Sequence, residues 1–324
     1  MHSIGELRTI VNRTFDAVSF SHEPAELYDP VVYTMNLGGK RIRPLLVLLG
    51  CDLFEGNLEH ATPAMLAIEL FHNFTLVHDD IMDLAPIRRG KETVYKKWNS
   101  NIAILSGDTM FAMACEYISG SDPMILPALL KVFTQTARNV CEGQQLDMNF
   151  ESSDKVDLAD YLEMIRLKTA VLLGCGLELG SMIAGASPAE SRKLYSFGEN
   201  IGLAFQLQDD LLDAFGDEKK FGKEIGGDIL THKKTFLFLK ALELATGKEK
   251  SELELCFSGK PVPPAEKIRR VMTVYETLKI KEITQKEIEK YFSLATGFSR
   301  EIKIPADRKK ILEEFAMELL HRDY

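Results

Sequence analysis

Two short acidic clusters with the same spacing are the residues of this chain best suited to chemistry. They are Asp79, Asp80 and Asp83, which follow an apolar run, and Asp209, Asp210 and Asp213, which lie far downstream. In a helix the first and last aspartate of each cluster lie one turn apart on one face. Like charges this close repel one another unless a cation binds them, and magnesium is typically held by one or two carboxylates together with substrate phosphates. One such cluster could be a solvated acidic surface, but two of identical spacing favour magnesium sites.

Three basic segments accompany these clusters. The segment Gly38-Gly39-Lys40-Arg41-Ile42-Arg43-Pro44 is a flexible turn that leads into a helix N-terminus, where backbone N–H groups and the helix dipole favour an anion. The planar guanidinium of arginine matches the geometry of a phosphate. The other two segments are Arg88, Arg89 and Lys91 after the first cluster, and Lys223, Lys233 and Lys234 after the second. Basic residues usually mark a solvated surface, but close to metal ligands they indicate phosphate binding.

Composition limits the functions that the chain could have. The 324 residues carry a net charge of −9, which argues against nucleic acid as the main partner. The hydrophobic content of 45% is ordinary for a globular protein. The five cysteines are scattered, the N-terminus lacks an apolar signal-peptide core, and no apolar run reaches the ~18 residues of a membrane span. We therefore predict a cytoplasmic protein with buried, reduced thiols and no transmembrane segment.

Apolar residues recur at helical spacing along nearly the whole chain. The predicted helices are one over 27–35, one from Pro44, one from Thr62-Pro63 to the first aspartate cluster, Asn101–Ile118, Pro123–Asn149, Leu158–Gly185, Pro188–Phe215, and three after Thr231, the last from about Ala306 to Leu319. No alternating strand pattern and no Asn-Gly hairpin is present. The Gly- and Lys-rich segment Gly216–Gly227 is interpreted as a loop over a site. These patterns predict one all-α domain over residues 1–324, a large helical bundle with a site between facing helices.

Three glycines, Gly174, Gly176 and Gly180, lie in one of these predicted helices. No strand precedes them and their spacing differs from that of a nucleotide-binding fingerprint. We interpret them as positions of close helix packing, because glycine is otherwise unfavourable inside a helix.

Taken together, the motifs resemble those of the polyprenyl synthetase family, the trans-isoprenyl diphosphate synthases. The residues that carry the resemblance are Gly38-Gly39-Lys40-x-x-Arg43-Pro44, His72, both aspartate motifs, Arg88-Arg89-Gly90, Lys168-Thr169, Gln206 and Gly226-Gly227-Asp228. They span Gly38 to about Thr235, in the order and at intervals compatible with the family. The resemblance implies an all-α fold of the isoprenoid synthase type, a single large helical bundle around a deep central cavity, in a homodimer.

The resemblance also implies a reaction, the head-to-tail condensation of an allylic diphosphate with isopentenyl diphosphate. Three magnesium ions would be coordinated by Asp79, Asp83 and Asp209, with Asp80, Asp210 and Asp213 in support. The allylic diphosphate would be bound by Arg88, Lys168, Lys233 and Lys223, and isopentenyl diphosphate by Lys40, Arg43, His72 and Arg89. Gln144 and Asp147 match a pair that the family places near the metals.

The expected chemistry agrees with physical principles. A diphosphate leaves readily when its developing charge is neutralised, and the allylic carbocation that remains requires an apolar site closed to water. The dipoles of Thr169 and Gln206 could stabilise that cation. The departed diphosphate can take the final proton, so no protein nucleophile is needed. His78, beside Asp79, is interpreted as an orienting or structural residue.

Product length is expected to depend on the helix that precedes the first motif. In the family, bulky residues four and five positions before the first aspartate form the floor of the product cavity. These positions are Thr75 and Phe74 here, and Phe71 lies one turn further away. Five residues of helix span only ~7.5 Å. A single aromatic at the fifth position, with no insertion in the motif, resembles enzymes that make the C20 product, geranylgeranyl diphosphate; farnesyl diphosphate (C15) is the near alternative.

Three other classes are weighed against this hypothesis. A class I terpene cyclase shares the bundle and the first motif, but its second motif normally mixes Asn, Ser or Thr with Glu. A non-catalytic prenyltransferase subunit usually lacks one aspartate motif, whereas both are intact here. A di-iron carboxylate bundle requires Glu-x-x-His pairs on facing helices, and none is suitably placed.

Overall fold

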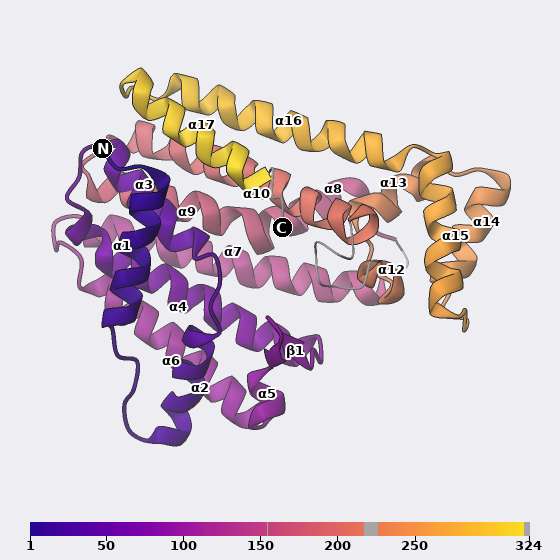
Figure 1. The fold of residues 1–324 in the computed structure, drawn as a ribbon, viewed down its shortest axis with the longest axis horizontal. Coiled ribbons are helices and arrows are strands. Elements are labelled where there is room, and N and C mark those ends of the chain that lie inside the picture. Colours follow the sequence, from indigo (N-terminus) through magenta and orange to yellow (C-terminus); the bar gives the residue numbers. More distant parts are fainter. Residues whose placement is uncertain (154, 217–225, 321–324) are drawn as a thin grey trace. The chain divides into compact units, whose positions relative to one another are not determined.

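A computed structural model describes residues 1–153, 155–216 and 226–320, which are helical over most of their length (Figure 1). The chain divides into two compact units. Unit 1 comprises Met1–Ala137, Cys175–Tyr195 and Ile302–Ile311, and unit 2 comprises Arg138–Gly174, Ser196–Glu301 and the described residues from Leu312 onward. The predicted all-α class is confirmed, and a single domain over the whole chain stays a prediction.

Unit 1 is built around one long, almost fully surrounded helix, α4. Its elements are α1 (Ile4–Ala17), α2 (Ala25–Asn36), α3 (Ile42–Leu53), α4 (Leu58–Met82), β1 (Ile87–Arg88), β2 (Lys91–Glu92), α5 (Val94–Lys97), α6 (Ser100–Ser119), the first part of α7 (Leu126–Ser152), the end of α9 (Val171–Ile183) and the starts of α10 (Pro188–Phe215) and α17 (Ala306–Leu320). Helix α4 packs against α2, α3 and α6. Its buried residues fall on every side from Ala61 to Phe71, which explains the absence of a strictly one-sided apolar pattern there.

Unit 2 contains the rest of α7 and the shorter helices that follow. Its further elements are α8 (Leu158–Ile165), the π-helix η1 (Arg166–Ala170), the start of α9 (Val171–Ile183), the end of α10 (Pro188–Phe215), α12 (Gly227–Leu230), α13 (Phe236–Leu244), α14 (Gly247–Phe257), α15 (Pro264–Thr277), α16 (Ile280–Glu301) and the end of α17 (Ala306–Leu320). Leu203, Leu207 and Leu211 recur every four residues and bury one face of α10 in the core of this unit. Asp209 therefore falls on the opposite, exposed face.

Several predicted boundaries were wrong. Helix α4 begins at Leu58 rather than at Thr62-Pro63, because the side chain of Asn57 caps it by accepting a 3.0 Å hydrogen bond from the backbone N–H of Glu59. The predicted helix Leu158–Gly185 is interrupted by η1. In the part of the chain that the structure describes, five helices, α13 to α17, follow Thr231 instead of three, since Gly247 and Pro264 each begin a new short helix.

The structure also contains a small hairpin that the sequence did not reveal. Strands β1 and β2 pair antiparallel, with Arg88 opposite Lys91. The two-residue turn is Arg89-Gly90, with φ of 52° and 74°. Two positive φ values are typical of the tight hairpin turn that Asn-Gly usually forms. The absence of Asn-Gly therefore did not exclude a hairpin, because arginine takes the first position here.

Two further expectations can be compared with the structure. Within the described residues, no helix is long and apolar enough to cross a bilayer. Cys51, Cys175 and Cys256 are buried as expected, but Cys115 is only partly buried and Cys141 is exposed, so the prediction that all thiols are buried was wrong for these two residues. The apolar residues next to Cys141 in the sequence did not indicate that its side chain is exposed on α7.

The interpretation of the glycines as packing positions is confirmed where α9 meets α3 in unit 1. A Cβ atom on Gly180 would lie 2.0 Å from the carbonyl oxygen of Val47, and one on Gly176 would lie 3.2 Å from that of Arg43. On α3, a Cβ on Gly50 would lie 2.4 Å from the carbonyl oxygen of Leu177. The two backbones approach closely enough that neither helix tolerates a side chain at these points.

We expect Gly180→Ala to destabilise the protein, because the new methyl group meets backbone that no rotamer change can move. The apparent free energy of unfolding, measured by urea denaturation with circular dichroism, should fall by about 1–3 kcal/mol, the usual effect of overpacking. Gly297→Ala on α16 is the matched control, because no atom lies within 4 Å of the position that its Cβ would take. That change should be neutral or raise stability by up to about 1 kcal/mol through helix propensity. Equal effects of the two substitutions would contradict the packing interpretation.

Candidate active site

The two aspartate motifs occupy the C-terminal ends of α4 and α10. Asp79 and Asp80 lie in the last turn of α4, and Asp83 is its C-cap, with its backbone N–H donating to the carbonyl of Asp79 at 2.8 Å. In unit 2, Asp213 comes just before the end of α10. Negative side chains at this end oppose the helix dipole and repel one another. Each cluster is therefore a place where a bound cation would be stabilising.

The middle aspartate of the first motif is bound within the chain. Asp80 is only 4% exposed, and the Nε of Arg88 donates to its Oδ1 at 2.7 Å. A second nitrogen of Arg88 lies 3.4 Å from Oδ2 of Asp79. Burial raises the pKa of Asp80 to about 6, although the charge of Arg88 opposes the shift. Arg88, predicted only to bind diphosphate, thus also holds the first motif in place.

Arg89 turns toward the glycine-rich segment. Its guanidinium donates a hydrogen bond to the carbonyl of Gly38 and covers the backbone of Gly39, where a Cβ would lie 2.8 Å from the guanidinium carbon. Gly39 also has a φ of 141°, which disfavours other residues. The two family-like segments Gly38-Gly39 and Arg88-Arg89, far apart in sequence, are therefore in direct contact in unit 1.

Arg43 and His72 lie near Arg89, and we call these three residues the basic cluster of unit 1. Nη1 of Arg43 donates to Nε2 of His72 at 3.1 Å, and from this bond we assign the imidazole proton to Nδ1. Burial lowers the pKa of His72 well below its ordinary value, and the neighbouring guanidinium groups lower it further. His72 is therefore neutral. The cluster also includes Glu69, which the sequence analysis missed: burial raises its pKa, while the charges of Arg43 and Arg89 oppose that shift.

An aromatic cluster lies one to two turns before the first motif. The ring of Phe74 stacks on that of Phe111 from α6, with centroids 5.3 Å apart, and Phe71 contacts both rings and that of Phe133 from α7. The sequence identified Phe71 and Phe74 but missed Phe111 and Phe133, which look like ordinary apolar positions of their own helices. The hydroxyl of Thr75 donates to the carbonyl of His72 at 2.7 Å.

His78 has contacts that fit the structural role expected for it. Its Nε2 lies 3.1 Å from the carbonyl oxygen of Ile104, and its ring meets that of Phe74 edge-on at 4.7 Å. The ring fills the space above Gly107, where a Cβ would lie 2.3 Å from Nε2. These contacts tie α4 to α6 just before the aspartates.

In the second motif, Asp210 is the buried middle carboxylate, 6% exposed. The hydroxyl of Tyr161 on α8 donates to its Oδ2, and Nε2 of Gln206 donates to its Oδ1 at 3.2 Å. Burial raises the pKa of Asp210, and these two hydrogen bonds oppose the shift. Oε1 of Gln206 accepts in turn from the hydroxyl of Thr169 at 3.3 Å. No local pattern in the sequence indicates a role for Tyr161.

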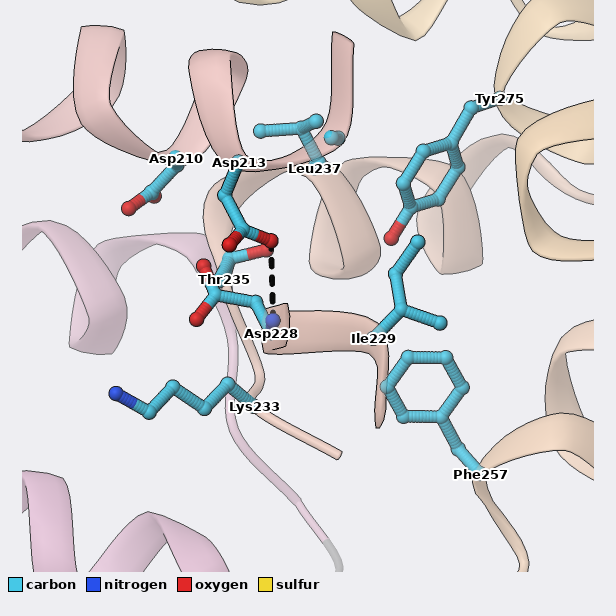
Figure 2. Close-up of a pocket in the computed structure, with 10 residues that line it drawn as sticks. Asp210, Asp213, Asp228, Ile229, Lys233, Thr235, Leu237, Phe257 and Tyr275 are labelled. Carbon is cyan, nitrogen blue, oxygen red and sulfur yellow. Dashed lines mark hydrogen bonds between the residues drawn. The ribbon is translucent and has the colours of Figure 1, made fainter. Parts of the chain in front are cut away.

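The third aspartate of this motif is bound by the helix that follows. The backbone N–H of Asp228, in the first turn of α12, donates to Oδ2 of Asp213 at 3.0 Å (Figure 2). The side chains of Asp213 and Asp228 line a small pocket with Lys233 and Tyr275, whose volume of about 10 Å³ suits a single water molecule. Burial and the charge of Asp213 raise the pKa of Asp228 to about 6, while Lys233 lowers it.

The π-helix η1 carries the other predicted residues of unit 2. It holds Lys168, whose Nζ lies 2.6 Å from Oδ2 of Asp147 on α7, together with Thr169. A π-helical turn shifts the register of a helix and is frequent at functional sites. Lys234, grouped in the sequence with phosphate-binding residues, instead donates to the carbonyls of Phe150 and Ser153 at the end of α7, 2.5 Å from each.

The predicted site residues thus form two groups, one in each unit. Unit 1 contains Lys40, Arg43, Phe71, His72, Phe74, Thr75, Asp79, Asp80, Asp83, Arg88 and Arg89; unit 2 contains Gln144, Asp147, Lys168, Thr169, Gln206, Asp209, Asp210, Asp213 and Lys233. Lys223 and most of the segment Gly216–Gly227 lie outside the described residues.

The donor sets fit magnesium bound jointly with a phosphate ligand. In each motif the outer aspartates keep more contact with solvent than the middle one: Asp83 and Asp209 are exposed, and Asp79 and Asp213 are partly buried. All are hard oxygen donors, which magnesium prefers. In the described part of the chain, no three His, Cys, Asp or Glu side chains already form a complete protein-only metal cage, whereas magnesium usually keeps water and phosphate ligands as well.

Comparison with known proteins agrees with this geometry. Residues 24–277 match the family described as Polyprenyl synthetase. The chain is 36% identical over 318 residues to the geranylgeranyl diphosphate synthase of Sulfolobus acidocaldarius, covering 95% of this chain and 96% of that one. A crystal structure of a geranylgeranyl pyrophosphate synthase superimposes with a TM-score of 0.95 at 44% identity, covering all of both chains.

A further solved structure has bound ligands in its description. It is the geranylgeranyl pyrophosphate synthase of Corynebacterium glutamicum, complexed with isoprenyl diphosphate and magnesium, with a TM-score of 0.85, 28% identity and coverage of 98% of both chains. The family match extends from α2 to the end of α15 and includes both aspartate motifs. This chain belongs to the polyprenyl synthetase family.

Proposed function

We propose that the protein is a magnesium-dependent short-chain trans-prenyltransferase that makes geranylgeranyl diphosphate. It condenses dimethylallyl, geranyl or farnesyl diphosphate with isopentenyl diphosphate and releases diphosphate. The observation that carries this proposal is that both motifs are intact and that in each the middle aspartate is buried and hydrogen-bonded, while the outer aspartates keep more contact with solvent. The relatives named as geranylgeranyl diphosphate synthases support the same product.

Asp79, Asp83 and Asp209 are the residues that would hold magnesium, three ions in all, on the allylic diphosphate. Bound magnesium would neutralise the charge that develops on the departing diphosphate. Arg88, Lys168 and Lys233 would add positive charge to the same group, and Lys223 is proposed with them. Arg88 is already fixed by Asp80, so it needs little reorganisation before it binds the anion.

Isopentenyl diphosphate would be bound by the basic cluster of unit 1. Arg43 and Arg89 supply planar donors that match a phosphate, and Lys40 adds a third positive charge. Neutral His72 can donate through Nδ1 while its Nε2 accepts from Arg43. In its ionised form, the buried Glu69 would reduce the mutual repulsion of these guanidinium groups before the diphosphate arrives.

The carbocation left on the allylic chain must be kept from water. The rings of Phe71, Phe74 and Phe111 provide an apolar wall one to two turns before Asp79 on the same side as His78. The hydroxyl of Thr169 and the amide of Gln206 are already aligned by their mutual hydrogen bond. We assign them the stabilisation of the cation by fixed dipoles, which work best where solvent is excluded.

Farnesyl diphosphate synthesis is the second candidate function. Four positions before Asp79 the residue is Thr75. The absence of an aromatic side chain at this position favours the C20 product. However, Phe111 from α6 adds a second ring to the wall formed by Phe74, and a thicker floor would stop the growing chain earlier. A terpene cyclase would differ from both in needing no isopentenyl diphosphate.

We expect Asp79→Asn to lower kcat by about a thousandfold, because magnesium contributes several kcal/mol of charge stabilisation. The assay follows product formation from isopentenyl diphosphate with dimethylallyl, geranyl and farnesyl diphosphate, in magnesium chloride and in EDTA. Asp29→Asn on the exposed side of α2 is the control and should keep wild-type activity. Turnover of an allylic diphosphate without isopentenyl diphosphate would indicate a cyclase, and full activity in EDTA or in Asp79→Asn would contradict the proposal.

We expect Phe74→Ala to yield products longer than C20, because it removes one of the stacked rings from the wall. Thr75→Phe should shift the product toward C15 by adding an aromatic to it. Product length is measured by mass spectrometry after dephosphorylation. Phe298→Ala on α16, a partly buried phenylalanine of unit 2, is the matched control for loss of a ring. An unchanged product distribution in both Phe74→Ala and Thr75→Phe would rule out this wall as the floor.

The proposed functional form is a homodimer, and α6 offers a surface for it. Ile104 and Leu105 are adjacent on this helix and 45% and 53% exposed, and exposed apolar neighbours favour association. Leu105→Asp should therefore shift the sedimentation coefficient in analytical ultracentrifugation from that of a dimer to that of a monomer. Leu294→Asp on α16, exposed to a similar extent at 46%, should leave the dimer intact. A monomeric wild-type protein would overturn the proposed assembly.

A further inference from the structure

Tyr161 makes a hydrogen bond that the proposed chemistry does not require and that no motif predicts. Its ring is buried in the core of unit 2, 3% exposed, and its hydroxyl donates to Oδ2 of Asp210. The residue lies in the second turn of α8, whose start is fixed by a capping box between Asp157 and Asp160. A rigid, buried ring on a well-capped helix is a precise way to place a hydroxyl group.

With this bond, both oxygens of Asp210 are bound by the chain. Tyr161 binds Oδ2, and Gln206 binds Oδ1 at 3.2 Å. Gln206 is fixed in turn by Thr169 of η1. The network therefore connects three elements, α8, α10 and η1, and it orients the amide of Gln206 with its nitrogen toward Asp210 and its oxygen toward Thr169.

The two motifs differ in how the middle carboxylate is compensated. Asp80 is paired with a positive charge, that of Arg88, at 2.7 Å. The donors to Asp210 are neutral, and the carboxylates of Asp209 and Asp228 act against its ionisation. Neutral hydrogen bonds stabilise a buried carboxylate less than an ion pair does. The orientation of Asp210 therefore depends strongly on each of its two donors.

We propose that Tyr161 is a positioning residue for the metal site of the second motif. By holding Oδ2, it keeps the side chain of Asp210 buried and directs the motif so that Asp209 presents its oxygens to magnesium. Without the hydroxyl group, Asp210 has an unpaired buried oxygen and rotates to find another partner. That rotation disturbs its neighbours in the motif and also Gln206. The inference rests on the proposed function for its metal, but the binding of magnesium and diphosphate can be measured without turnover.

The test uses Tyr161→Phe, which removes only the hydroxyl group, and inorganic diphosphate as the probe. Ligands that bind the native state raise the thermal midpoint in proportion to the logarithm of their concentration over Kd. Magnesium chloride is titrated at fixed diphosphate, and the concentration that gives half of the full rise in midpoint is recorded. For Tyr161→Phe this concentration should increase about tenfold, as is typical when a residue that supports a metal ligand is changed. Tyr291→Phe, a partly buried tyrosine on α16, is the control and should match wild type.

A double-mutant cycle shows whether Tyr161 acts through Asp210. In the Asp210→Asn background, Tyr161→Phe should have little further effect on the magnesium requirement, because the bond that it removes no longer has its carboxylate acceptor. Asp210→Asn alone should raise the requirement by a similar factor, so it provides the second measurement if Tyr161→Phe is too unstable. A purely structural role would lower the midpoint without ligand and leave the magnesium requirement unchanged.

The outcomes separate this inference from the proposed function. An unchanged magnesium requirement in Tyr161→Phe, or an equal effect with and without Asp210→Asn, overturns the positioning role while the prenyltransferase stands. A wild-type protein that binds magnesium and diphosphate but forms no prenyl product overturns the function and leaves the role of Tyr161 to be decided by the same titration. A tenfold change that disappears in the Asp210→Asn background supports the inference.

Discussion

Carboxylates crowded at the C-terminal end of a helix repel one another and also face the negative end of the helix dipole. Both aspartate motifs of this chain lie at the C-terminal end of a helix. The surrounding residues offset part of the resulting repulsion. In each motif the middle carboxylate, Asp80 or Asp210, is buried and bound by donors of the chain. The outer carboxylates keep more contact with solvent than the middle ones, and a bound cation would relieve their repulsion. The proposed metal would therefore offset a repulsion that is built into both helix ends.

Repulsion between like charges also affects the basic cluster of unit 1, where the charges are positive. The guanidinium groups proposed to bind a diphosphate would repel one another before it arrives. His72, whose pKa is lowered by burial and by these guanidinium groups, adds no further positive charge, and Glu69 is buried within reach of the charges of Arg43 and Arg89. Arg89 reaches this cluster because the hairpin turn places it at a positive φ, with its guanidinium over Gly39. The contact between Arg89 and the backbone of Gly39 thus depends on two features, the positive φ of Arg89 and the absence of a side chain at Gly39.

The sequence predicted those parts of the site that depend on local spacing. The one-turn separation of Asp79 and Asp83, the glycine turn before Arg43 and the close-packing glycines on α9 are all properties of a short segment. It did not predict contacts that join distant segments through neutral or apolar groups. Tyr161 and Asp210 are 49 residues apart, and Phe74 and Phe111 belong to different helices. The hairpin was not predicted because its turn contains Arg89-Gly90 instead of the usual Asn-Gly, and arginine is rare at positive φ.

In the proposed function, helix α4 carries two roles on one backbone, metal binding and the limit on product length. The aspartates occupy its last turn, and the rings of Phe71 and Phe74 occupy the turns before it, so the distance between the reacting end and the wall is set by helix geometry at ~7.5 Å for five residues. This spacing cannot drift, because α4 is packed against α2, α3 and α6, and His78 is bound to the carbonyl of Ile104. In the proposed function, the length of the product would change with the size of a few side chains on the wall, while the proposed metal ligands and Arg88, which binds Asp80, would stay in place. A synthase built on such a helix would vary its products without altering its chemistry.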